Sequence, residues 1–173
     1  MRGLITTHSG VSFQVFNPTP EMVNIEDIAW SLSHLCRFNG HSKRFYSVAE
    51  HCVRGSLYCS IENALWFLLH DAAEAYVGDI MKPLKTNVHR KVEDRVLRVI
   101  ADKYGLIWPM PAEIHEVDQR VLVTEAQELM TGTMFKELMT GTSPYEGFYE
   151  VYELKDPFTW EETFLHVFYS YRK

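Results

Sequence analysis

The sequence predicts a mainly α-helical single domain that begins with a small β-hairpin. Two short stretches of alternating apolar and polar residues, GLITTHSG and VSFQVFNP, open the chain and meet around Ser9, as the strands of a hairpin do. Beyond residue 24, apolar residues recur at the i, i+3, i+4 spacing of helices with one buried face. A chain of 173 residues can bury one core, so we expect one domain.

Local signals predict where the helices begin and end. Apolar periodicity predicts a helix from Ile25 to Cys36. Ser47 and Glu50 match the S-x-x-E capping box, in which each side chain bonds the other's free amide, and this helix should end near Tyr58. Further helices are expected from about Glu62 to Tyr76 before Gly78, from about Asn87 to Tyr104 before Gly105, from Pro111 through Leu129, and from an Asp156 cap with Pro157 at the first position.

The expected domain has three parts. Residues 1–20 form the hairpin, residues 25–131 form the helical core that also carries the candidate metal ligands, and residues 132–173 form a C-terminal loop and helix. The hexapeptide ELMTGT occurs at residues 128–133 and again at 137–142. We interpret this as a tandem duplication at a helix end, because two copies cannot build a repeat fold.

Composition excludes several classes of protein. Hydrophobic residues make up 46% and charged residues 23%, which is typical of globular domains, and the apolar run Ala64–Leu69 is too short to cross a bilayer. The N-terminus has no long apolar segment of a secretory signal, and three cysteines without CxxC spacing suggest free thiols, so we expect a cytoplasmic protein. A net charge of −6 disfavours binding to duplex nucleic acid.

The stretch LLHDAAEAYVGDI carries the most informative chemistry. It places His70, Asp71, Glu74 and Asp79 within ten positions, directly after an apolar run. Burying a histidine and a carboxylate is costly unless something compensates, and a divalent cation bound by both would do so. On a helix, Glu74 lies four positions after His70 and three after Asp71, so all three side chains project from neighbouring positions on one face.

Further metal ligands must come from elsewhere in the chain. His51 follows the capping box, and Asp118 lies beside core-facing positions of a later helix, where an acid needs a partner. Two nitrogen and two oxygen ligands fit Mn, Co, Fe or Zn better than Mg. Glu116 is a rival for Asp118, and His70 with Asp71 could instead form a hydrogen-bonded pair at a helix end.

The ordered pattern resembles that of the HD-domain phosphohydrolases. The segments CRFNGHSKRFYSVAEH and LLHDAAEAYVGDIMKPLK, followed by a later aspartate, are similar to small bacterial 5′-deoxynucleotidases and to phage relatives that remove triphosphate from dATP. The resemblance covers residues 25–129. It implies His51, His70, Asp71 and Asp118 as metal ligands, and Arg37, Phe38 and Lys85 as substrate-binding residues. It also implies Glu74 as the acid that orients or deprotonates the attacking water and Asp79 as a second catalytic carboxylate; either of the two could protonate the leaving group.

Hydrolysis of a deoxynucleotide phosphate is therefore the expected activity, assisted by one divalent transition metal (Mn, Co, Zn or Fe, with Mg less suited). A monophosphate or a triphosphate could be the substrate, and the latter would need further cations such as Lys43, Arg44, Lys82 and Lys85. Arg37 could instead cap its helix, and Lys85 could be a surface lysine.

Two expectations remain beside this one. A catalytically silent HD module that binds nucleotide without hydrolysing it is the alternative function. The resemblance also implies a homo-oligomer, for which the aromatic C-terminal helix could be a contact surface, although its aromatic residues are most simply core.

Overall fold

The computed structural model describes residues 3–132, 141–149 and 156–172, and the expected mainly helical fold with an N-terminal hairpin is confirmed. Strand β1 (Leu4–Thr6) pairs antiparallel with β2 (Ser12–Gln14), and Ile5 lies opposite Phe13. Within the described ranges, no helix is both long enough and apolar enough to span a bilayer. The second ELMTGT copy begins at residue 137 and lies largely outside the described residues.

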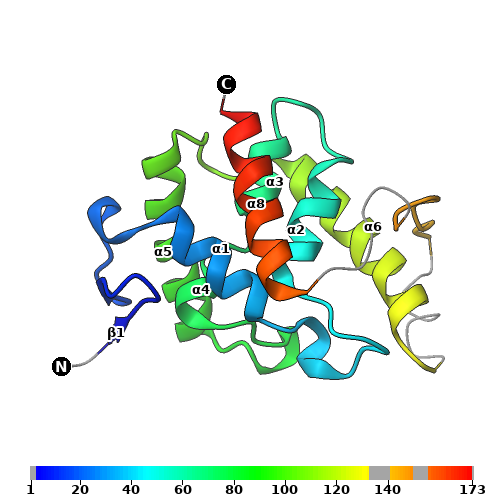
Figure 1. Cartoon of the computed structure of the whole chain (residues 1–173), viewed down its shortest axis with the longest axis horizontal. Helices are drawn as coiled ribbons and strands as arrows, with labels where there is room; N and C mark the ends of the chain where they lie inside the picture. The colour runs from blue at the N-terminus through cyan, green and yellow to red at the C-terminus, as the bar shows by residue number, and fades with distance from the viewer. Residues whose placement is uncertain (1–2, 133–140, 150–155, 173) are drawn as a thin grey trace.

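The helices are α1 (Ile25–His34), α2 (Val48–Ser56), α3 (Ala64–Leu69), α4 (Glu74–Val77), α5 (Asn87–Tyr104), α6 (Ala112–Leu129) and α8 (Pro157–Tyr171). Single 3-10 turns occur at Pro20–Met22, Arg37–Gly40 and Lys82–Leu84. Figure 1 shows α8 across the middle of the molecule, where it packs against α1, α2 and α3. The hairpin lies at one end of the long axis and the C-terminal part of α6 at the other.

Most predicted helix ends are found, with one difference in the capping box. Asp156 Oδ1 accepts a hydrogen bond from the Thr159 amide, and left-handed Gly105 ends α5. Ser47 Oγ accepts from the Glu50 amide at 3.0 Å. The carboxylate of Glu50, however, does not complete the box; it pairs with half-buried Arg44 and buried Arg54, each at 2.9 Å, because these guanidinium groups compete for it.

The predicted continuous helix from Glu62 to Tyr76 is wrong, since residues 70–73 separate α3 from α4. Backbone bonds there tighten to i→i+3 spacing, for example from the Glu74 amide to the Asp71 carbonyl. The cause lies at His70, whose Nδ1 bonds the Phe67 carbonyl at 2.6 Å. That carbonyl is therefore shared between a side chain and the backbone.

Two apolar clusters hold these helices around the site. The aromatic stripe of α8 is buried against α1 and α2, with Trp160 and Phe164 0% exposed, so these residues are core, whereas Phe158 and Tyr169 of the same helix are exposed. Val117 and Val121 of α6 pack with Phe67 in the second cluster. Because these two valines face inward, Asp118, which follows Val117 on α6, lies close to α2 and to the end of α3.

Candidate metal centre

Four side chains from three parts of the chain converge as the sequence predicts. His51 on α2 and His70 after α3 face each other with their Nε2 atoms 3.4 Å apart. Asp71 Oδ2 lies 3.6 Å from His51 Nε2 and 3.3 Å from His70 Nε2. Asp118 Oδ1, on α6, lies 3.4 Å and 3.8 Å from the same two nitrogens. Donor atoms of His51, His70 and Asp118 lie within 4.8 Å of one another.

These separations suit ligands of one metal ion. Ligand atoms about 2.1 Å from an ion are separated by about 3.4 Å in a tetrahedral site and by about 3.0 Å at right angles in an octahedral one. Burial alone would lower the pKa of His70, but Asp71 and Asp118 raise it well above its ordinary value. Burial alone would raise the pKa of Asp118, but His51 and His70 hold it well below its usual range. The cluster therefore attracts positive charge, which fits a cation.

The structure separates the candidate ligands from their rivals. Glu116 is exposed on α6, whereas Asp118 points at the histidines. The Cys52 thiol also lies near His70 and Asp71. Burial raises the pKa of Cys52 to about 11, which favours the neutral thiol over the thiolate that binds metals.

Both histidines are oriented by a second hydrogen bond on the far side of the ring. His51 Nδ1 donates to Glu125 Oε1 at 2.7 Å, and His70 Nδ1 donates to the Phe67 carbonyl. Such outer partners place the proton on Nδ1 and leave Nε2 for the metal. Sequence reasoning assigned no role to Glu125. Its signal was the spacing of seven residues from Asp118, about two helical turns, which places both acids on one face of the predicted helix.

A pocket of about 290 Å³ opens beside the four candidate ligands. Its walls include all the predicted catalytic and substrate-binding residues and two of the ligands: Arg37, Phe38, Glu74, Asp79 and Lys85, with Asp71 and Asp118. Ile80, Met81, Lys82 and Leu122 complete it. The turn after α1, helix α4, the segment that follows α4, and α6 therefore form one concave surface.

The two catalytic candidates are carboxyl groups in an unfavourable environment for ionisation. Glu74 is 6% exposed, and its Oε2 has no hydrogen-bond partner within the described part of the chain. Burial, together with Asp71 and Asp79, raises the pKa of Glu74 to about 10. Burial also raises the pKa of Asp79. Buried acids of this kind are suited to exchanging protons with a ligand.

Arg37 turns its guanidinium toward the metal centre instead of capping α1. Its NH2 lies 3.0 Å from Glu125 Oε2 and its NH1 3.5 Å from Asp71 Oδ2. Burial alone would lower the pKa of Arg37, but these two acids raise it, so the charge is retained. Arg37 Nε is buried without a partner among the described residues. One donor of the guanidinium, Nε–H, is therefore left for a ligand.

The two residues after Arg37, one of which lines the pocket, have a strained backbone. Phe38 and Asn39 both have left-handed backbones, with φ of 54° and 51°. This conformation costs roughly 1–2 kcal/mol for a residue with a Cβ and is found preferentially at functional sites. The turn places the Phe38 ring on the pocket wall, where the Arg37 guanidinium lies 5.6 Å from the ring centre.

The basic residues near the pocket divide into two groups. Lys82 and Lys85 line it, and Lys85 Nζ lies 2.6 Å from Glu93 and 3.7 Å from Glu74. Lys43 and Arg44 do not line it: the Lys43 ammonium donates to the Glu128 carbonyl, and Arg44 holds Glu50. Of the four cations predicted as polyphosphate contacts, two are therefore at the pocket.

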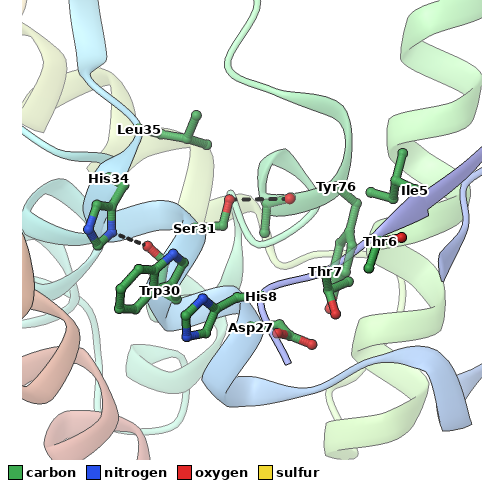
Figure 2. A pocket seen from close by; sticks show the side chains of 11 residues that line it. Ile5, Thr6, Thr7, His8, Asp27, Trp30, Ser31, His34, Leu35 and Tyr76 are labelled. Atoms are coloured by element: carbon green, nitrogen blue, oxygen red, sulfur yellow. Dashed lines mark hydrogen bonds between the residues drawn. The ribbon is translucent and has the colours of Figure 1, made fainter. Parts of the chain in front are cut away.

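A second cavity of about 370 Å³ lies between β1, α1 and α4 and contains none of the predicted site residues (Figure 2). His8 and His34 both stack on Trp30, with ring centres 3.7 and 4.4 Å away. The Asp27 carboxylate at its edge accepts two hydrogen bonds from Ser9. These contacts join the hairpin to α1, so we regard the aromatic wall as structural.

The fold and the site define a mainly helical protein with a candidate centre of two histidines and two aspartates. No protein-family model matches the chain. It is 41% identical over 127 residues to the uncharacterized protein YfdR of Escherichia coli K12, a match that spans 72% of this chain and 71% of YfdR. An uncharacterized protein of Rhodobacter capsulatus is 33% identical over 118 residues, which are 61% of this chain and 60% of that protein. The chain belongs to the same family as YfdR.

Proposed function

We propose that the chain is a metal-dependent phosphohydrolase that acts on deoxynucleotides. The observation that carries this proposal is the convergence of His51, His70, Asp71 and Asp118 beside a pocket that also holds Arg37 and two protonatable carboxyls. The resemblance of the motifs to HD-domain phosphohydrolases supports the same activity. A bound divalent transition metal (Mn, Co, Zn or Fe, with Mg less suited) supplies a Lewis acid at the phosphoryl group and lowers the pKa of water.

The substrate phosphate is received by Arg37 and Lys85. Arg37 offers the unpaired Nε and, on another edge of the same plane, the loosely engaged NH1 as donors for phosphate oxygens. Lys85 reaches the same pocket as a mobile point charge that exchanges Glu93 for phosphate. The Phe38 ring on the wall supplies an apolar face for the nucleoside.

Hydrolysis forms a bond from water oxygen to phosphorus and breaks the bond from phosphorus to the 5′-oxygen. The water gives up a proton and the departing 5′-oxygen takes one, so no net proton is consumed by the two carboxyls. The resemblance assigns Glu74 to the attacking water, but its raised pKa favours Glu74 as the donor to the leaving oxygen, with Asp79 left to accept from water.

A deoxynucleoside monophosphate is the favoured substrate within this proposal. Lys43 and Arg44 are held by Glu128 and Glu50, away from the pocket, so they are not placed to neutralise further phosphates. A triphosphate is the second candidate, favoured by exposed Lys82 on the pocket wall. The cytoplasmic setting, consistent with three unpaired cysteines, and the homo-oligomer remain parts of the proposal.

Product analysis tests these versions against one another. The protein, loaded in turn with Mn²⁺, Co²⁺, Zn²⁺ or Fe²⁺, is incubated with panels of deoxynucleoside mono- and triphosphates. Inorganic phosphate released from a monophosphate selects the nucleotidase, and tripolyphosphate released from a triphosphate selects the triphosphohydrolase. Nucleotide binding without product selects the silent module. The proposal would be refuted if the protein neither bound nor hydrolysed any of these nucleotides with any of the four metals.

A matched pair of α6 variants makes the test specific to the metal centre. Asp118→Asn removes a predicted ligand, and Glu116→Gln removes an exposed acid two residues away. We expect loss of hydrolysis in the first variant and normal hydrolysis in the second. Equal activity in the two variants would remove Asp118 from the ligand set.

A further inference from the structure

Glu125 occupies a central place between the metal centre and the phosphate-binding arginine. It lies on α6, is 0% exposed, and receives three hydrogen bonds. Its Oε1 accepts from Tyr46 Oη and from His51 Nδ1, both at 2.7 Å. Its Oε2 accepts from Arg37 NH2 at 3.0 Å. A buried carboxylate with charged and polar donors on both oxygens is held in one orientation.

The contact with His51 determines which ring nitrogen is available. Because Nδ1 donates to a carboxylate, Nε2 is the atom directed at His70 and Asp118. Partners of this kind also restrict rotation of the ring and make it a better ligand.

The contact with Arg37 determines the direction of its remaining donors. A guanidinium group is planar and rigid, so fixing NH2 on Glu125 also fixes where NH1 and Nε point. NH1 is only loosely engaged, 3.5 Å from Asp71, and Nε has no partner among the described residues. A phosphate can therefore accept from Nε, or replace Asp71 at NH1, while Glu125 keeps NH2.

We propose that Glu125 is a positioning residue that aligns the metal ligand His51 and the phosphate-binding Arg37 through the two oxygens of one carboxylate. The inference rests on the proposed function and adds to it a physical link between the metal and phosphate sites. Loss of the carboxylate should weaken both kinds of binding, although Glu125 touches neither ligand.

Glu125→Gln is the informative substitution, because it keeps the shape of the side chain. An amide has one acceptor oxygen, so its NH2 group must oppose either Arg37 or the pair formed by Tyr46 and His51. Glu125→Asp keeps the charge but is shorter, and cannot reach both sides at once. It serves as the second variant if the first does not fold.

Glu113→Gln is the matched control. Glu113 lies on the same helix, and its carboxylate also accepts three hydrogen bonds, but from Ser60 and Asn63 at the other end of α6. It shares the chemistry of Glu125 without touching the candidate site.

Three measurements are made on the wild-type chain and these variants. Mn²⁺ affinity is measured by calorimetry, and inorganic phosphate is then titrated into the Mn²⁺-loaded protein. The visible spectrum of the Co²⁺-loaded protein reports ligand geometry. Proton NMR of the metal-free protein follows the exchange-protected imidazole proton that His51 shares with Glu125.

We expect Mn²⁺ affinity to fall by about 10- to 100-fold in Glu125→Gln and Glu125→Asp, with weaker phosphate binding and a changed Co²⁺ spectrum. The imidazole proton signal should shift or be lost in both, and Glu113→Gln should match the wild type throughout. Mn²⁺ and phosphate affinities within twofold of wild type, with unchanged spectra, would overturn the inference. If the wild-type chain binds no metal, the proposed function fails, and the imidazole signal still decides the role of Glu125.

Discussion

Replacing Glu74 by glutamine should stabilise the metal-free protein at alkaline pH while removing hydrolysis. The Glu74 carboxyl is 6% exposed, and burial with two neighbouring acids, Asp71 and Asp79, raises its pKa to about 10 from an ordinary 4.5. An acid whose folded-state pKa is raised costs no stability below the unfolded pKa. The cost grows as the pH rises from the unfolded pKa toward the folded pKa.

The size of the effect follows from these values. Each pH unit above the unfolded pKa is worth about 1.4 kcal/mol, so the upper limit at pH 8 is about 5 kcal/mol. Lys85, whose Nζ lies 3.7 Å from Glu74 Oε1, offsets part of this, as does water that enters the pocket. We therefore expect Glu74→Gln to raise the free energy of unfolding by roughly 1–3 kcal/mol at pH 8, or roughly 2–10 °C in Tm.

Thermal unfolding of chelator-treated protein from pH 4 to pH 8 measures this difference. Wild type and Glu74→Gln should nearly coincide at pH 4 and diverge steadily above pH 5. Glu113→Gln should behave in the opposite way, because hydrogen bonds from Asn63 and Ser60 lower the pKa of Glu113, and the stability it contributes is present above its unfolded pKa. A Glu74→Gln protein no more stable than wild type at pH 8 would refute the reasoning.

Three further perturbations have defined outcomes. Lys85→Met should weaken phosphate binding about 10-fold, whereas Glu93→Gln, which frees the Lys85 ammonium, should not; equal loss in both would contradict the assignment. Mn²⁺ binding at pH 7 should release protons, because the pKa of His70 is raised in the metal-free protein. Calorimetry in buffers of different ionisation enthalpy measures the number of protons released, and a value of zero would contradict this expectation. Gly55→Ala should destabilise the fold by about 1–3 kcal/mol in urea unfolding, since the added methyl collides with the Phe67 ring; unchanged stability would show that the ring moves freely.

Helix ends and the four converging ligands illustrate what local sequence can predict. Helix α5 begins and ends at the predicted Asn87 and Tyr104, because a threonine cap and a left-handed glycine act within one turn of the chain. Asp118 could be ranked above Glu116 only by its neighbours on the helix, and the structure separates the two by the direction in which each points. Their chemical role as ligands stays a prediction.

The sequence by itself determined the helical fold class, the caps and the residue types available for metal and phosphate chemistry, since these depend on periodicity and on bonds between near neighbours. Tertiary structure alone decided which charges meet. It paired Glu125 with His51 across 74 positions and with Arg37 across 88, drew Lys43 and Arg44 away from the pocket, and separated α3 from α4. The physical reason is that a buried charge takes whichever partner packing brings within about 3 Å, and no local pattern encodes that choice.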